Sequence, residues 1–171
     1  APLVVRHGEL RQQHALARIV KRSELWRSGF DADEDAVEGR RQALSAALSS
    51  GFPRETAEAR VEYGFGLLLA RRLPEAREVL TAAIEETQAL GMGVLQLRAM
   101  THLLIVYRFQ EDVAHSAALH RPALELAQVV GSPIYLGMVK AEQAWTLLRQ
   151  GDRAEAACAV EAALHAWQHQ E

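Results

Sequence analysis

The residues best suited to chemistry in this sequence are Cys158, His165 and His169. On a helix of 3.6 residues per turn, their spacing of i, i+7 and i+11 brings them within about 40° of one another. Thiolate and imidazole groups bind zinc, and Glu155 or Glu161 would complete a set of four ligands. A solvated or repeat-stacking helix face has the same spacing, and His-x-x-x-His is common without a metal. We therefore predict no metal site and keep the zinc site as the alternative.

No other residues form a catalytic motif. Histidines such as His115 and His120 are scattered, with no serine or cysteine nucleophile placed beside them by a motif. Gly91-Met-Gly93 lacks the lysine and the preceding strand of a phosphate-binding loop. Acidic pairs such as Glu85-Glu86 are typical of solvated helix faces and helix ends. The sequence predicts a protein that is not an enzyme and needs no cofactor.

Composition excludes several classes of partner. The chain has 171 residues, 19 Lys+Arg and 22 Asp+Glu, for a net charge of −3, so the basic excess of a nucleic-acid binder is absent. No apolar run reaches the roughly 20 residues that a membrane span needs. Cys158 is the single cysteine, which suits the reducing cytoplasm. The chain lacks an initiator Met and a signal peptide, so we expect a piece of a larger protein.

The elements that position these residues repeat every 40 residues. Gly51, Gly91 and Gly131 are spaced 91−51 = 40 and 131−91 = 40. Small residues recur in the same frame at Ala36, Ala76, Ser116 and Ala156 and at Ala43, Ala83, Ala123 and Ala163. A fixed period between 20 and 50 residues indicates a stacked repeat protein.

Helix signals dominate the chain. Apolar residues follow the i, i+3, i+4, i+7 pattern, for example in Pro74–Leu90. Prolines at helix starts and glycines after helix ends mark the breaks, with Ser132, Asp33 and Asp152 as N-caps. We expect eight helices, near residues 5–28, 34–50, 53–71, 74–90, 93–110, 112–130, 133–150 and 153–169.

Short connections force consecutive helices into antiparallel hairpins. The units run from about 12–51, 52–91, 92–131 and 132–171, and residues 1–13 form an N-terminal extension. We expect these units to make one domain over residues 1–171. Pro122 falls inside the helix at 112–130, so we expect a kink near Ala118.

Small and aromatic residues at fixed offsets connect the units to a known family. In the second unit, Ala76 follows Gly64 by 12 residues (76−64 = 12), and Ala83 follows Ala76 by 7 residues (83−76 = 7). The residues that carry this pattern are Tyr63, Gly64, Leu67, Ala76, Leu80 and Ala83, then Ala144, Leu147, Gly151, Ala156, Val160 and Ala163. The pattern resembles a tetratricopeptide repeat (TPR), which implies an all-α, TPR-like right-handed superhelix of four stacked antiparallel helical hairpins.

The length of the repeat unit indicates which kind of TPR the chain resembles. A standard TPR has 34 residues, whereas these units have 40. Longer units of this kind resemble the repeats in the sensor arms of bacterial regulators of the maltose-activator type, which are NTPases of signal transduction. Residues 147–156 and 71–78 carry this likeness. The resemblance implies a cytoplasmic bacterial signalling or transcriptional regulator.

The resemblance also implies a concave binding face built from the first helix of each unit. One column of that face holds Leu25, Phe65, Ile105 and Trp145, which pack first helices together or contact a partner. The other implied positions are Arg18, Lys21, Arg98, Thr101, Arg108, Phe109, Met138 and Arg149. An apolar seam flanked by cations suits a peptide with hydrophobic and acidic side chains.

Two functions follow as expectations. The first is a non-catalytic module that binds a peptide or protein segment on the concave face, with no direct nucleic-acid or membrane contact. The alternative is a small-molecule sensor, with Pro122 at the opening of a pocket between repeats. We further expect Leu164, Trp167 and the edge of Val160 to be partly exposed on an uncapped C-terminal helix, which favours self-association or a continuation of the chain.

Overall fold

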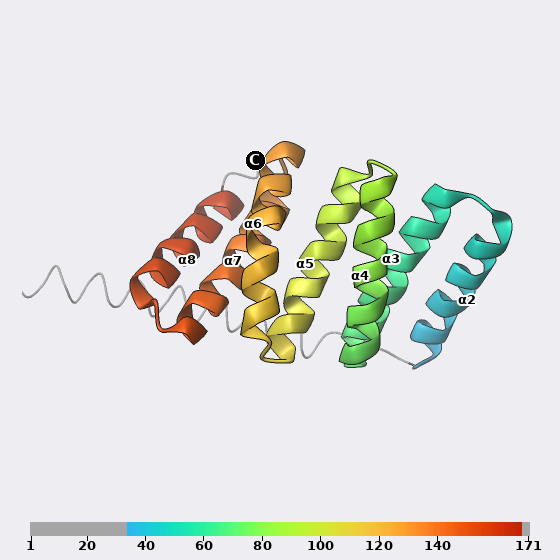
Figure 1. Ribbon diagram of the computed structural model, residues 1–171, viewed down its shortest axis with the longest axis horizontal. Helices are drawn as coiled ribbons and strands as arrows, with labels where there is room; N and C mark the ends of the chain where they lie inside the picture. Colours follow the sequence, from blue (N-terminus) through green and yellow to red (C-terminus); the bar gives the residue numbers. More distant parts are fainter. Residues whose placement is uncertain (1–33, 169–171) are drawn as a thin grey trace, which may run out of the picture. The chain divides into compact units, whose positions relative to one another are not determined.

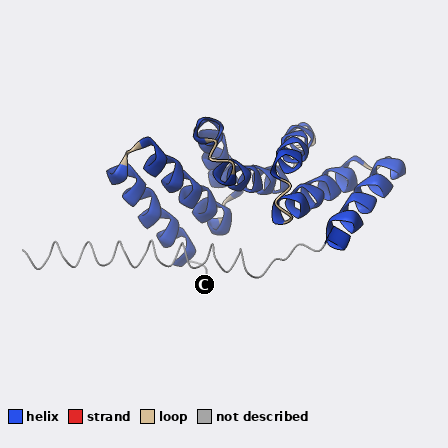
Figure 2. Cartoon of the chain, turned by 90° about the horizontal axis from the view of Figure 1, so that it is seen from below, coloured by secondary structure: helices blue, strands red, loops and turns tan. Residues whose placement is uncertain are grey.

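The computed structural model describes residues 34–168, which lie within the compact unit Ala32–Glu171 (Figure 1). This part of the chain contains helices and short loops and no strand (Figure 2). The all-α class is therefore confirmed for the described residues. Seven helices follow in order: α2 (Glu34–Ser50), α3 (Pro53–Leu69), α4 (Leu73–Ala89), α5 (Gly93–Phe109), α6 (Val113–Val130), α7 (Pro133–Gln150) and α8 (Arg153–Gln168).

The predicted helix bounds agree with these within two residues. The predicted helix near 5–28 and the extension 1–13 lie outside the described residues, as does Asp33. Ser132 precedes α7 as predicted, but its hydroxyl makes no capping hydrogen bond. The side-chain cap that the sequence reading missed is Asp112, which accepts a hydrogen bond from the backbone N–H of His115 at the start of α6.

The turns explain where the helices end. Gly51, Gly91 and Gly131 adopt positive φ angles of 73°, 66° and 68°, the left-handed conformation that glycine tolerates best. Arg71 and Glu111 adopt φ angles of 60° and 55° at the other end of the hairpins. The sequence predicts a helix break at both places, but the glycine pattern does not predict the positive φ angles of these two residues, although they share the 40-residue period.

Helix α6 continues through Pro122 from Val113 to Val130. A proline inside a helix removes one backbone hydrogen bond, yet the flanking turns keep this helix in one piece. The predicted kink near Ala118 therefore stays a prediction about curvature, since the helix is not broken.

Neighbouring hairpins stack on one another through the first helix of each hairpin. Helices α3, α5 and α7 begin the hairpins α3–α4, α5–α6 and α7–α8, and α5 contacts both α3 and α7. Each second helix contacts the first helix of the next hairpin, as α4 does with α5 and α6 with α7. Within the described residues no two of α4, α6 and α8 approach closely along their backbones, although Arg77 of α4 reaches Asp112 and His115 at the start of α6. We call the surface of α3, α5 and α7 that faces away from the second helices the first-helix face.

Small residues of the 40-residue columns lie between the helices of each hairpin. Ala76, Ser116 and Ala156 are buried, as are their counterparts Ala83, Ala123 and Ala163. In α2 the equivalent residues Ala36 and Ala43 are exposed. Leucines and valines fill the space around the small columns, including Val61, Leu67, Leu80, Leu97, Leu104 and Val106. The columns thus set how closely the helices approach.

The closest approach in the α3–α4 hairpin is at Gly64. A Cβ atom at this position would lie 2.7 Å from both Cγ and Cδ2 of Leu80, and 3.3 Å from Cγ1 of Val79. Leu80 is fully buried and has no space into which it could withdraw. Gly39, in contrast, has no atom within 4 Å of its hypothetical Cβ.

We predict that Gly64→Ala lowers the free energy of unfolding by about 1–3 kcal/mol, because the methyl group overpacks the hairpin. The matched change Gly39→Ala should raise it by about 0.5–1 kcal/mol, since alanine is the better helix former. Urea denaturation of both variants measures these values. Equal effects of the two substitutions would contradict the packing described here.

Candidate functional site

The predicted contact residues on the first helices fall into two groups. Phe65, Met138 and Trp145 are half-buried, and Phe65 stacks on the imidazole of His102 with ring centroids 4.4 Å apart. Ile105 and Thr101 are both buried, so at Ile105 the column packs helices together and Thr101 is not available to a partner. Arg18, Lys21 and Leu25 lie outside the described residues.

The predicted arginines are held by carboxylates of neighbouring helices. Arg98 of α5 forms an ion pair of 2.5 Å with Glu62 of α3. Arg108 of α5 contacts Glu142 of α7, with Nε donating to the carboxylate at 2.9 Å. The two arginines of α5 therefore tie this helix to α3 on one side and to α7 on the other.

Arg149 and Phe109 are also engaged within the chain. Arg149 lies 3.1 Å from Glu111, and both side chains are exposed. The ring of Phe109 carries the guanidinium of Arg71 at 3.8 Å and that of Arg108 at 4.7 Å from its centroid. Cation–π contacts of this kind fix the position of the ring. Phe109 thus acts first as a packing residue at the end of α5.

The sequence reading missed a polar column on the first helices. Glu62, His102 and Glu142 are spaced 102−62 = 40 and 142−102 = 40, and they occupy equivalent places on α3, α5 and α7. His102 and Glu142 are buried. The sequence signal for this polar column is the same 40-residue period that the small and apolar residues follow.

The Arg108–Glu142 pair is the most buried ion pair on this face. Burial raises the pKa of the Glu142 carboxyl group, and the guanidinium of Arg108 opposes that increase. Thr146, one turn further along α7, shares a hydrogen bond of 2.9 Å with Ser116 of α6. These polar contacts require one relative position of α5, α6 and α7, because a displaced helix would leave a buried polar group unpaired.

Two buried histidines remain neutral near pH 7. Burial, together with the smaller effect of the nearby charge of Arg98, lowers the pKa of His102 to about 3. Burial likewise lowers the pKa of His120 to about 4, although a backbone hydrogen bond with Glu142 opposes this decrease and Lys140 adds slightly to it. Nδ1 of His102 and Nε2 of His120 have no hydrogen-bond partner among the described residues. Protonation of either ring would place an uncompensated charge in the core.

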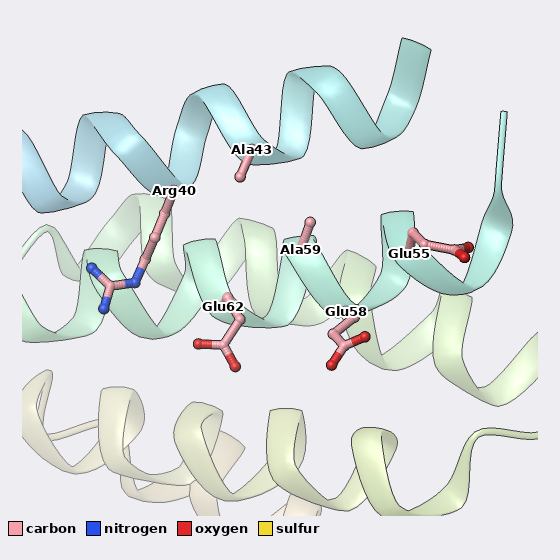
Figure 3. Close-up of a pocket in the computed structure, with 6 residues that line it drawn as sticks. All are labelled: Arg40, Ala43, Glu55, Glu58, Ala59 and Glu62. Atoms are coloured by element: carbon pink, nitrogen blue, oxygen red, sulfur yellow. The ribbon is translucent and has the colours of Figure 1, made fainter. Parts of the chain in front are cut away.

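An open groove of about 430 Å³ lies between α2 and α3 (Figure 3). Arg40 extends from α2 toward α3, while Glu58 and Glu62 point from α3 away from α2. The groove is lined by Arg40, Ala43, Glu55, Glu58, Ala59 and Glu62. The groove is open and has charged side chains in its lining, but these residues do not include the nucleophile and base that a hydrolytic site would need.

The alternative zinc ligands do not converge in the described part of the chain. Cys158 and His165 are exposed on α8, and His169 lies outside the described residues. No group of three metal-ligating side chains occurs within residues 34–168.

The C-terminal helix packs more closely than the sequence suggested. Val160 is buried, while Leu164 and Trp167 are half-buried as predicted. The indole of Trp167 lies against Gly137 of α7 and donates a hydrogen bond of 3.3 Å to the carbonyl of Ile134.

Comparison with known proteins adds no relative: no protein-family model matches the chain, and no curated protein matches it significantly. Among the described helices, none has the length and apolar character to cross a bilayer. Function must therefore be argued from the first-helix face itself.

We predict that Arg108→Leu lowers the free energy of unfolding by about 3–5 kcal/mol, because Glu142 is left buried without its partner. Replacing both residues, as Arg108→Leu/Glu142→Met, should restore much of this loss. Arg149→Leu removes the exposed pair and should cost less than about 1 kcal/mol. Guanidinium denaturation of the three variants measures the differences. A double variant less stable than Arg108→Leu would contradict this assignment.

A second prediction concerns pH. The folded pKa of His102 is depressed to about 3, so the unfolded chain binds its proton first as pH falls below about 6.5. The contribution of neutral His102 to the free energy of unfolding is therefore complete above about pH 6.5 and is lost as the pH falls. Between pH 7 and 5, the wild-type chain should lose about 2 kcal/mol more than His102→Phe.

Urea denaturation at both pH values measures this difference. Between pH 7 and 8 the two proteins should keep a constant difference in stability. Equal losses on acidification would show that His102 is not the buried neutral group described.

Proposed function

We propose that this chain is a TPR-like, non-catalytic interaction module that binds a peptide or protein segment. The observation that carries the proposal is the close backbone approach of α5 to both α3 and α7, whereas no two of α4, α6 and α8 approach so closely and α4 reaches α6 through the long side chain of Arg77. This asymmetry makes the first-helix face continuous across three hairpins. It is the face that would be concave in a TPR-like superhelix.

The chemistry of the face favours a partner with apolar anchors. Phe65, Met138 and Trp145 are half-buried, so each keeps part of its apolar surface available. Aromatic side chains are enriched at the energetic centres of protein interfaces. An extended or helical segment that places hydrophobic side chains along the three helices would suit this arrangement.

Acidic groups on the partner are the second element of the proposal. Arg98 and Arg149 already pair with Glu62 and Glu111, but a guanidinium has five N–H donors and engages more than one acceptor. Because these arginines are held by carboxylates, they present donors in fixed positions. Acidic side chains of the partner would therefore fix the orientation of the bound segment, while its apolar anchors provide most of the affinity.

The resemblance, rather than the site, suggests the parent protein that we propose, a cytoplasmic bacterial signalling or transcriptional regulator. A small-molecule sensor would need an enclosed pocket between repeats. The groove between α2 and α3 and a second one beside α4 are both open, and neither includes Pro122. We therefore favour the protein-binding function.

Selection of random peptides displayed on phage, with the 171-residue chain as bait, tests this function. Peptides with spaced apolar and acidic residues should be enriched. Trp145→Ala should weaken their binding at least tenfold in fluorescence anisotropy, because it removes a central aromatic anchor.

The control is Phe52→Ala, which removes an exposed aromatic ring in the turn between α2 and α3. This variant should bind the selected peptides as the wild type does. Equal binding by Trp145→Ala, or failure to enrich any peptide sequence, would overturn the proposed function.

A further inference from the structure

Among the described residues, Arg108 is hydrogen-bonded through one of its three guanidinium nitrogens. Nε donates to Oε2 of Glu142 at 2.9 Å and to Oε1 at 3.2 Å, and no hydrogen bond or ion pair engages the terminal nitrogens Nη1 and Nη2. Both are open to solvent, since the buried side-chain nitrogens that lack a partner belong to His102 and His120. Arg108 therefore presents four N–H donors at the surface, on a side chain that Glu142 holds in place.

A second guanidinium lies against the same aromatic ring. The Cζ atom of Arg71 is 3.8 Å from the ring centroid of Phe109, and that of Arg108 is 4.7 Å from it. Arg71 reaches the ring from a left-handed turn with a φ of 60°, a conformation that costs free energy for a residue with a Cβ atom. Two guanidiniums beside each other attract an anion more strongly than either does alone.

The geometry favours a carboxylate as this anion. The two terminal nitrogens of a guanidinium match the two oxygens of one carboxylate. The carboxylate of Glu142 already lies 2.9 Å from Nε of Arg108. It would repel a doubly charged phosphoryl group about twice as strongly as a singly charged carboxylate.

We propose that Nη1 and Nη2 of Arg108, with Arg71 beside them, bind the side-chain carboxylate of an Asp or Glu in the bound segment. This inference rests on the proposed function and deepens it, because it gives the acidic group of the partner a defined site. Glu142, which holds Arg108, lies one turn before Trp145 on α7. The partner therefore carries its acidic residue close in sequence to the apolar anchor that contacts Trp145.

A blocked amino acid tests the site without a peptide. N-acetyl-glutamate N-methylamide has one carboxylate, on its side chain, and the glutamine analogue has none. We expect the glutamate probe to shift the amide signals of Phe109 and Gln110 in two-dimensional NMR, saturably and with a Kd of about 1–10 mM. The glutamine probe should leave these signals unchanged at the same ionic strength, and inorganic phosphate should bind more weakly than the glutamate probe.

Two variants remove the proposed donors one at a time. Arg108→Lys keeps a positive charge opposite Glu142 but lacks the terminal nitrogens, so it should weaken binding of the glutamate probe at least about fivefold. Arg71→Gly removes the second guanidinium, and glycine adopts the positive φ angle readily, so the hairpin should fold. This variant should weaken binding at least about threefold.

The matched control is Arg72→Lys, next to Arg71 in the chain. Nε and Nη2 of Arg72 both donate to the carboxylate of Glu75, so this guanidinium is already occupied and its replacement should leave the Kd unchanged. Shifts that do not saturate, an equal response to the glutamine probe, tighter binding of phosphate, or full affinity of Arg108→Lys would overturn the proposal.

The probe has no apolar anchor, so its failure would leave peptide binding at Trp145 standing. Failure of the phage selection, in contrast, would overturn the proposed function even where the probe binds.

Discussion

The structure depends on the close approach of two helices within each hairpin. That approach is possible because small side chains recur at fixed places, as Ala76, Ser116 and Ala156 do at intervals of 40 residues. Larger groups at these places would separate the helices and remove the contacts that bury Leu80 and Leu104. The period is therefore a packing constraint, and the turns and the surface chemistry follow it.

Polar contacts then select one arrangement of the packed hairpins. Apolar side chains tolerate small displacements, whereas a buried carboxylate that loses its guanidinium is costly. Arg108 and Glu142 make this contact between α5 and α7, and Arg98 and Glu62 make a more exposed one between α5 and α3. The ion pairs of α5, the central first helix, thus fix the positions of α3 and α7 in the first-helix face.

The same repeat produces surfaces of different chemistry. The first helices present half-buried apolar residues and paired arginines, while the turns between hairpins present exposed apolar residues. The opposite turns are rich in charge.

The helices were predictable from sequence because the residues at and next to their ends determine where they begin and end. Glycine at a left-handed position and proline at a helix start act within a few residues, so α2 and α7 have the predicted bounds. The turns at Arg71 and Glu111 were not identified by residue type, since these residues adopt positive φ without glycine. Local signals do not describe a conformation that tertiary packing imposes.

The candidate site was predictable only in part. The resemblance to TPRs placed Trp145 and Met138 on first helices, and the structure leaves both half-buried there. The carboxylates that hold the arginines were missed, because each lies 34–38 residues away in sequence (98−62, 142−108 and 149−111). Such partners are set by how helices cross, which a single sequence does not specify.

Amide hydrogen exchange of the free chain tests the central claim, that α5 is the covered centre of the stack. Residues 99–107 are buried without interruption, and amides in such a segment open only with the largest unfolding events. We expect these amides to exchange most slowly among residues 34–168, and those of α2 to exchange fastest. Exchange in α5 as fast as in α2 would contradict it.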